Sequence, residues 1–170
     1  MSSSTKLNLD PFGVEVSPTL YRSIIGSLLY LTTSRLDIAF SIGVCARYQA
    51  APKESHLTAV KRIIRYINGT PDYGLWYSKD SNACPAGYSD ADWASSVDDR
   101  KSTTEGCFYL GNNLVSWMSK KQNSVSLSTA EAEYVAAGSC CTQLLWMKKL
   151  LHDYGIPQDT MCVFYDNTSA

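Results

Sequence analysis

Apolar residues in the first part of the chain recur at helical spacing. Ser17 and Pro18 have the form of a helix N-cap followed by a first helical residue. The residues after them predict an amphipathic helix through the apolar positions Leu20, Tyr21, Ile24, Ile25, Leu28 and Leu29. Ser34 and Asp37 have the spacing of a capping box, which predicts a second helix that runs to about Tyr48.

A third helix is predicted from near Pro52 to a glycine that ends it. Its apolar stripe consists of Leu57, Val60, Ile64 and Ile67. Asn68 and Gly69 then supply a left-handed helix end. Residues 1–16 are polar without periodicity and are expected to form a flexible lead-in, whereas residues 17–80 are predicted to form a helical segment.

Strand patterns replace the helical ones after this segment. Residues 73–77 are short and aromatic, which predicts a strand. A second strand is predicted at residues 87–93, followed by a polar loop. The run CFYLGNNLVSWMS then indicates two strands joined by a turn at residues 111–113. The last three of these strands follow one another as an antiparallel series.

A long helix and a last strand follow. Residues 128–131 have the form of a capping box that opens a helix to about Tyr154, where Gly155 and Pro157 end it. The run MCVFYD is typical of a buried parallel strand that ends on an acid. Residues 81–170 therefore predict an α+β fold of three antiparallel strands, a long helix and a parallel fourth strand beside the first.

Charge divides the chain in the same way. The 170 residues carry a net charge of −1. Residues 1–80 hold 9 Lys and Arg against 6 Asp and Glu, and residues 81–170 hold 6 against 10. A basic part followed by an acidic part indicates two units with different roles.

The remaining sequence features exclude several classes of protein. The six cysteines form no CxxC pair, which argues against a zinc site. No apolar run is long enough to span a membrane, so no membrane partner is expected. No targeting signal is visible at the N-terminus, and an intracellular location, cytoplasmic or nuclear, is expected with reduced thiols.

Three acids stand out as candidate metal ligands. Asp90 lies within a predicted strand, Glu133 in the first turns of the long helix, and Asp166 at the end of the last predicted strand. Carboxylates that converge on one edge of a sheet form an oxygen-only site suited to Mg²⁺. The alternative is that the three are solvated strand ends and a helix-dipole partner, as most such acids are.

Longer stretches of sequence resemble a known family. The blocks GYSDADWA, STAEAEYVAA and VFYDN resemble the successive acidic blocks of the ribonuclease H fold. Three further stretches are similar to sequences of plant copia-type LTR retrotransposon Pol polyproteins. They are DWASSVDDRKST, LVSWMSKKQNSVSLSTAEAEY and LLWMKKLL. Two stretches of the helical segment resemble the part between reverse transcriptase and ribonuclease H in the same polyproteins. They are YRSIIGSLLYLTTSRLDIAF and HLTAVKRIIRYINGT.

The resemblance implies a fold, an activity and a site. Residues 17–80 would be the thumb- or connection-like helical tail of a reverse transcriptase, and residues 81–170 a ribonuclease H-like domain. Asp90, Glu133 and Asp166 would be the catalytic acids that hold two Mg²⁺ ions, for which Mn²⁺ can substitute. The parent activity would be RNA-directed DNA synthesis together with Mg²⁺-dependent hydrolysis of RNA in RNA–DNA hybrids. The alternative is a decayed, non-catalytic remnant that at most binds nucleic acid or protein.

The same resemblance implies binding partners, and the positions of nearby charged residues predict their roles. The expected partners are an RNA–DNA hybrid or other nucleic acid, and the palm and integrase of the polyprotein. Lys61, Arg62 and Arg65, away from the apolar stripe of their helix, are the candidate phosphate contacts. Glu131 is predicted to cap the helix, since it cannot share a helix face with Glu133. Asp92 is expected beside the site or at the surface.

Some positions depart from the family pattern. Leu36 stands where the family usually has proline, and Glu105 stands near a usual glycine. The family's fourth acid would lie beyond Ala170, so the fragment alone is expected to have little or no nuclease activity.

Overall fold

The computed structural model describes residues 6–79 and 81–167. The chain divides into two compact units. The helical unit comprises Met1–Leu75 with Ser96–Asp99, and the sheet unit comprises Trp76–Ser95 with Arg100–Ala170. No helix in the described part of the chain is both long enough and apolar enough to cross a membrane.

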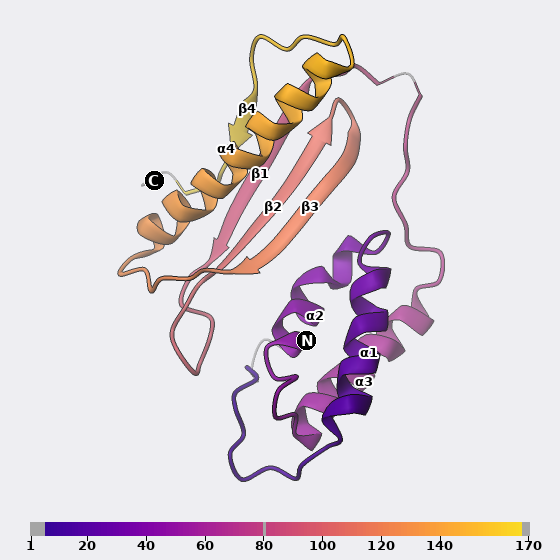
Figure 1. Ribbon diagram of the computed structural model, residues 1–170, viewed down its shortest axis with the longest axis vertical. Coiled ribbons are helices and arrows are strands. Elements are labelled where there is room, and N and C mark those ends of the chain that lie inside the picture. Colours follow the sequence, from indigo (N-terminus) through magenta and orange to yellow (C-terminus); the bar gives the residue numbers. More distant parts are fainter. Residues whose placement is uncertain (1–5, 80, 168–170) are drawn as a thin grey trace. The chain divides into compact units, whose positions relative to one another are not determined.

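Three α-helices and a short 3-10 helix build the helical unit (Figure 1). They are α1 (Pro18–Leu31), η1 (Leu36–Ile38), α2 (Ala39–Ala46) and α3 (Glu54–Gly69). The Ser17 side chain accepts a hydrogen bond from the Leu20 N–H, so the predicted N-cap is confirmed. The helices enclose one apolar core that consists of Tyr21, Ile25, Leu28, Ile38, Ile42, Cys45, Ala59, Val60 and Ile63.

The predicted capping box at Ser34 and Asp37 is wrong. The Ser34 hydroxyl donates to the carbonyl of Leu31, which ends the preceding helix. Asp37 instead forms a two-pronged ion pair with Arg35, at 3.0 and 2.8 Å. The second helix therefore starts as the 3-10 turn η1, and α2 begins only at Ala39.

Arg35 is the buried polar centre of this region. Besides Asp37, its guanidinium donates to the carbonyl and the hydroxyl of Thr70, at 2.9 and 2.7 Å. The rings of Tyr66 and Tyr73 lie 5.7 and 5.8 Å from its Cζ. Arg35 thus ties the start of η1 to the end of α3.

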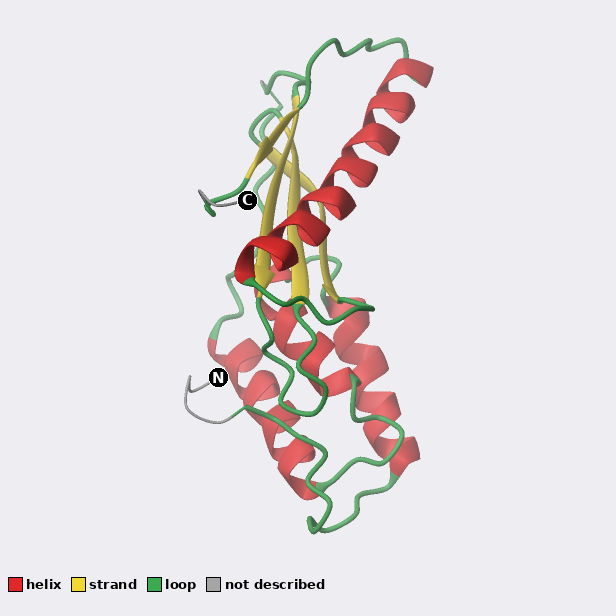
Figure 2. Cartoon of the chain, turned by 90° about the vertical axis from the view of Figure 1, so that its left-hand side faces the viewer, coloured by secondary structure: helices red, strands yellow, loops and turns green. Residues whose placement is uncertain are grey.

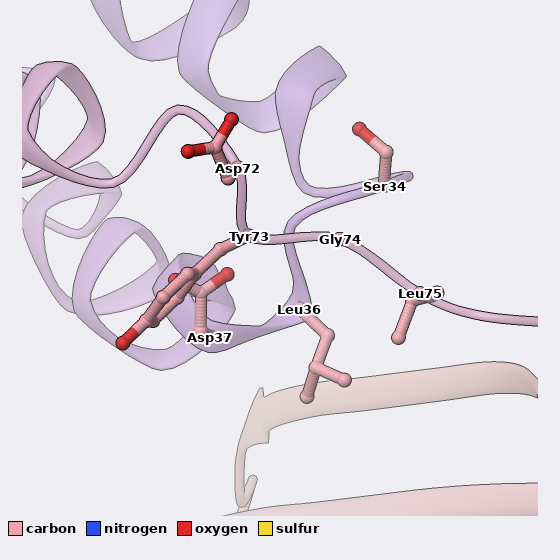
Figure 3. Close-up of a pocket in the computed structure, with 7 residues that line it drawn as sticks. All are labelled: Ser34, Leu36, Asp37, Asp72, Tyr73, Gly74 and Leu75. Carbon is pink, nitrogen blue, oxygen red and sulfur yellow. The ribbon is translucent and has the colours of Figure 1, made fainter.

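A pocket of about 290 Å³ lies beside this cluster (Figure 3). It is lined by Ser34, Leu36, Asp37, Asp72, Tyr73, Gly74 and Leu75. Leu36, one of the two departures from the family pattern, is one of these lining residues (Figure 3). Of the two carboxylates in this lining, that of Asp37 is already paired with Arg35.

The strand predicted at residues 73–77 is wrong. These residues have no regular secondary structure. Tyr73 lies against the Arg35 guanidinium, and Trp76 is largely exposed. Aromatic composition favours a strand only where a neighbouring strand offers hydrogen bonds, and no strand pairs with this described segment.

The sheet unit contains a four-stranded mixed sheet in the order β3-β2-β1-β4. Its strands are β1 (Pro85–Asp92), β2 (Thr103–Leu110), β3 (Asn113–Lys121) and β4 (Cys162–Phe164). β1, β2 and β3 pair antiparallel, and β4 pairs parallel to β1. Gly111 turns the chain between β2 and β3 with a φ of 60°. The three antiparallel strands and the parallel fourth strand are as predicted.

The fourth strand is less buried than the sequence indicates. Cys162 and Phe164 are exposed, and Val163 is half-buried. β4 has only three residues and pairs with β1 on one side. Within the described residues it is an edge strand, which explains its exposure.

One long helix, α4 (Thr129–Asp153), covers one face of the sheet (Figures 1 and 2). Its N-cap is Ser128, whose hydroxyl accepts from the Glu131 N–H at 3.1 Å. The Glu131 carboxylate accepts from the Leu127 N–H, so the predicted capping box exists with its return bond shifted by one residue. The helix packs mainly on β1 and β2. The buried residues between helix and sheet are Phe108, Cys140, Leu144 and Met147.

Gly87 sets how closely α4 approaches the sheet. A Cβ atom at this position would lie 2.7 Å from the Cys140 Sγ and 3.0 Å from the Leu144 Cδ1. Only a residue without a side chain permits this close packing. The position of α4 over β1, and of every group that α4 carries, therefore depends on Gly87.

Candidate metal centre

The structure brings the three candidate acids together. One oxygen each from Asp90, Glu133 and Asp166 can be chosen so that all lie within 4.8 Å of one another. Asp90 and Asp166 are exposed, and Glu133 is buried. Asp90 lies in β1, Glu133 in the second turn of α4, and Asp166 two residues beyond the end of β4.

The pairing of β1 with β4 explains why the two aspartates meet. Tyr88 of β1 and Phe164 of β4 are partners in the parallel register, and their rings stack with centroids 5.0 Å apart. Asp90 and Asp166 each follow a member of this pair by two residues. Because the two strands run parallel, equal offsets from this pair bring the two aspartates to the same place along the sheet.

Glu133 reaches the same place from the helix. Its Oε1 accepts a hydrogen bond from the Ala91 N–H of β1 at 3.1 Å, and that N–H also lies 2.8 Å from an Asp90 oxygen. Its Oε2 is buried and has no hydrogen-bond partner among the described residues. Burial raises the pKa of Glu133, and the charges of Asp90 and Asp166 raise it further.

The neighbouring acids take other positions. The exposed Glu131 uses its carboxylate to accept from the Leu127 N–H, as expected of a helix cap. Asp92 does not belong to the group of three acids. The sequence therefore identified the correct helix face for Glu133, one turn into α4.

Glu105 is a site neighbour that the sequence reading did not place. It is the residue of β2 directly opposite Asp90, and its Oε1 lies 3.5 Å from the Ser119 hydroxyl. Burial raises its pKa, and the charges of Asp90 and Asp92 raise it further. The two-residue alternation of side chains on β1 and β2 could have placed Glu105 beside Asp90, but only once the register of the two strands was known.

The candidate phosphate contacts lie in the other unit. Lys61, Arg62 and Arg65 are all exposed on α3, which confirms the exposure expected of them. They lie away from the buried α3 residues His56, Ala59, Val60 and Ile63.

The donor set of the three acids fits a hard divalent cation. Carboxylate oxygens are the ligands that Mg²⁺ and Mn²⁺ prefer. A buried oxygen without a partner costs free energy unless a cation or a proton satisfies it. The unpartnered Oε2 of Glu133 therefore supports a cation between these three side chains.

The chain is similar to retrotransposon proteins along its whole length. It is 40% identical to the retrovirus-related Pol polyproteins from transposons RE2 and RE1 of Arabidopsis thaliana, over all of this chain and 12% of each relative. It is also 40% identical to the retrovirus-related Pol polyprotein from transposon TNT 1-94 of Nicotiana tabacum, over 88% of this chain and 11% of the relative. No protein-family model and no solved structure matches the chain.

The chain thus spans only about an eighth of the length of these curated relatives. The similarity includes both units, because two of the alignments cover the whole chain. The chain belongs to the family of Pol polyproteins of copia-type plant retrotransposons.

Proposed function

We propose that the sheet unit is the ribonuclease H part of a Pol polyprotein, whose parent activity is hydrolysis of the RNA strand of RNA–DNA hybrids with divalent metal ions. The helical unit is the end of the reverse transcriptase part, whose parent activity is RNA-directed DNA synthesis. The observation that carries this proposal is the convergence of Asp90, Glu133 and Asp166. The buried Oε2 of Glu133, which has no hydrogen-bond partner in the described part of the chain, adds to it.

The sheet topology supports the same proposal. Three antiparallel strands, a helix over one face and a fourth strand parallel to the first are what a ribonuclease H-like fold requires. In that arrangement the first acid lies on the first strand, the second on the helix and the third after the fourth strand. Asp90, Glu133 and Asp166 occupy these three places.

Each acid has a defined part in holding the metal. Asp90 and Asp166 offer exposed oxygens toward the solvent from which a nucleic acid approaches. The Ala91 N–H fixes one oxygen of Glu133 and leaves the other for a cation. Mg²⁺ or Mn²⁺ bound there supplies an activated water and stabilises the leaving 3′ oxygen.

The test is cleavage of a labelled RNA–DNA hybrid by the purified chain in Mg²⁺ and in Mn²⁺. We expect the wild-type fragment to cleave little or not at all. Asp90→Asn should weaken Mn²⁺ binding, measured from the free Mn²⁺ signal in electron paramagnetic resonance, and should remove any residual cleavage. Asp92→Asn is the matched control, because it makes the same change two residues along β1 and outside the group of three acids.

Two results would contradict the proposal. The first is Mn²⁺ affinity that is equal in wild type and Asp90→Asn. The second is a complete absence of Mn²⁺ binding and of cleavage, which would favour the alternative of a non-catalytic remnant that at most binds nucleic acid or protein.

A separate prediction concerns the basic residues of α3. Replacing Lys61, Arg62 and Arg65 together with alanine is expected to weaken hybrid binding without regard to sequence. Each lost phosphate contact lowers the slope of log affinity against log salt by about 0.9, so the triple variant should lose between about 2 and 3. Fluorescence anisotropy in a KCl series measures the slope. An unchanged slope would show that these three residues do not contact phosphate.

A further inference from the structure

The outer face of α4 carries an apolar stripe that the sheet does not cover. α4 packs mainly on β1 and β2, which lie against its inner face (Figures 1 and 2). On the outer face, Tyr134 is 64% exposed and Leu145 is 61% exposed, and Cys141 between them is exposed as well. Neighbouring exposed apolar side chains, unlike single ones, mark a surface that binds a partner.

This stripe has the spacing of a coiled-coil seam. Its residues follow one another at alternating intervals of three and four, so they keep to one side of the helix. All of them are exposed except the half-buried lysine at the end. Together they form the α4 seam, which is about 25 Å long. The α4 seam consists of Glu131, Tyr134, Gly138, Cys141, Leu145 and Lys148.

Gly138, near the middle of the α4 seam, has no role in the packing of the described residues. A Cβ atom at this position would meet no heavy atom within 4 Å in the described part of the chain. Glycine inside a helix is destabilising relative to alanine, so its presence here needs another reason. A second helix that crosses α4 at this point supplies one, because the missing side chain lets the two helix axes approach closely.

The α4 seam is complementary to a second copy of itself in the antiparallel direction. Two antiparallel copies of α4 that cross beside Gly138 place it opposite Cys141 of the other copy. They also place Tyr134 of each copy opposite Leu145 of the other. Small residues then lie at the crossing point, where the helices are closest. The large residues lie one turn away, where the axes diverge and leave more space.

The charges at the two ends of the α4 seam favour this direction. In the antiparallel pair, Glu131 of each copy lies opposite Lys148 of the other, whereas a parallel pair would bring like charges together. Glu131 already accepts from the Leu127 N–H, and Lys148 donates to the Asp159 carbonyl at 3.4 Å. A carboxylate has a second oxygen and an ammonium has two more donors, so both groups can also meet the opposite charge.

We propose that α4 pairs antiparallel with α4 of a second copy of this chain, through the α4 seam. Glu133 lies about 100° around the helix from Tyr134 and accepts from the Ala91 N–H of β1. The pairing therefore does not use the three acids, and it is independent of the proposed function.

Sedimentation velocity of the full chain over a concentration series tests the pairing. EDTA and a reducing agent are present, so that neither metal bridges nor disulfides contribute. Wild type should show a concentration-dependent equilibrium of monomer and dimer. Tyr134→Lys and Leu145→Glu should each raise the dimer Kd by about 100-fold or more, because each places two unpaired charges against apolar side chains.

Trp146→Glu is the matched control for Leu145→Glu. Trp146 is the next residue of α4 and is 56% exposed, but it points about 100° away from Leu145 around the helix. Its dimer Kd should equal that of wild type. A wild-type dimer whose Kd does not change in Tyr134→Lys and Leu145→Glu would use another surface, which would overturn the proposal.

Mixing the two charged variants tests the direction of the pair. In the antiparallel pair, the new lysine of Tyr134→Lys lies opposite the new glutamate of Leu145→Glu, and the other such layer keeps its native residues. The mixture should therefore recover dimer that neither variant forms alone, which also shows that both variants are folded. A parallel pair offers no such contact, so a mixture without recovered dimer would contradict the antiparallel direction.

Gly138→Leu tests the crossing point. A leucine there holds the helices apart, so the dimer Kd should rise by at least about tenfold, although the surface has become more apolar. Ser139→Leu adds the same side chain at an exposed neighbour outside the α4 seam and should not raise the Kd. A wild-type chain that stays monomeric at every concentration would overturn the proposal, as it would if another segment of a longer polyprotein covers the α4 seam. Mn²⁺ binding by wild type and Asp90→Asn decides the proposed function separately.

Discussion

Glu133→Gln is expected to stabilise the metal-free sheet unit at neutral pH and to remove most of the stabilisation that Mn²⁺ provides. Glu133 is buried, and its Oε2 has no hydrogen-bond partner among the described residues. Desolvation therefore opposes its charge, and the neighbouring Asp90 and Asp166 charges oppose it as well. A neutral glutamine keeps the bond to the Ala91 N–H and removes this repulsion.

The pH dependence of this stability difference follows from the direction in which the pKa of Glu133 is shifted. The pKa of Glu133 is raised in the folded chain, so the folded state holds the proton more tightly than the unfolded state does. Below the ordinary glutamate pKa of 4.5 the carboxyl is neutral in both states, and this contribution to stability is fully present. It is lost as the pH rises through the raised pKa. The advantage of Glu133→Gln over wild type should accordingly appear above pH 4.5 and vanish below it.

Mn²⁺ is expected to reverse the order of stability of wild type and Glu133→Gln. A ligand that binds only the folded state at 100 times its Kd stabilises that state by about 2.7 kcal/mol. With Mn²⁺ at this excess over the wild-type Kd, wild type should gain this amount and Glu133→Gln less than about 1 kcal/mol, because it has lost a charged ligand. Tryptophan fluorescence during urea unfolding measures the sheet unit alone, since Trp76, Trp93, Trp117 and Trp146 all lie in it.

Glu131→Gln is the matched control for this prediction. It makes the same chemical change two residues earlier, at a side chain that caps the helix and faces away from the acids. Its Mn²⁺ stabilisation should equal that of wild type. An equal response to Mn²⁺ in wild type and Glu133→Gln would show that Glu133 does not hold the metal.

Gly87→Val is expected to destabilise the sheet unit by about 2–3 kcal/mol, at the upper end of what overpacking costs. The first added carbon would already lie 2.7 Å from the Cys140 Sγ and 3.0 Å from the Leu144 Cδ1. These atoms belong to the buried layer between α4 and the sheet, where little space is available for rearrangement. The helix must therefore move away from β1, and Glu133 moves with it.

Ala86→Val controls for the preference of valine for strands. Ala86 is adjacent in β1 and lines the opposite face of the sheet, with Tyr88 and Tyr109. Urea unfolding followed by tryptophan fluorescence compares the two variants, and Mn²⁺ affinity should fall only in Gly87→Val. A difference of less than about 0.5 kcal/mol between them would show that the close approach at Gly87 is not needed for packing, because that is the usual range of neutral substitutions.

Local signals in the sequence predicted most elements correctly. The N-cap at Ser17, the turn at Gly111 and the cap at Ser128 were all readable, because each depends on residues within a few positions of one another. Two of the errors arose where a distant residue intervened. Asp37 pairs with Arg35 instead of completing the expected capping box. The Tyr73 ring lies against Arg35 instead of joining the expected strand.

Burial and side-chain neighbours were harder to predict than element type. Asp166 was expected at the end of a buried strand, but β4 is short and exposed. Glu105 was visible only as a departure near a usual glycine of the family pattern. Its place opposite Asp90 follows from the register of β1 with β2, which no local pattern specifies.

The sequence by itself determined the family and most of the elements, and it singled out the three acids, since periodicity, capping residues and characteristic sequence motifs are all properties of contiguous residues. The tertiary structure decided that Asp90, Glu133 and Asp166 meet, and that Oε2 of Glu133 is buried without a hydrogen-bond partner among the described residues. These features depend on the parallel register of β1 with β4 and on the close packing of α4 at Gly87. Both join residues far apart in the chain, so their geometry is set by how the whole sheet unit packs.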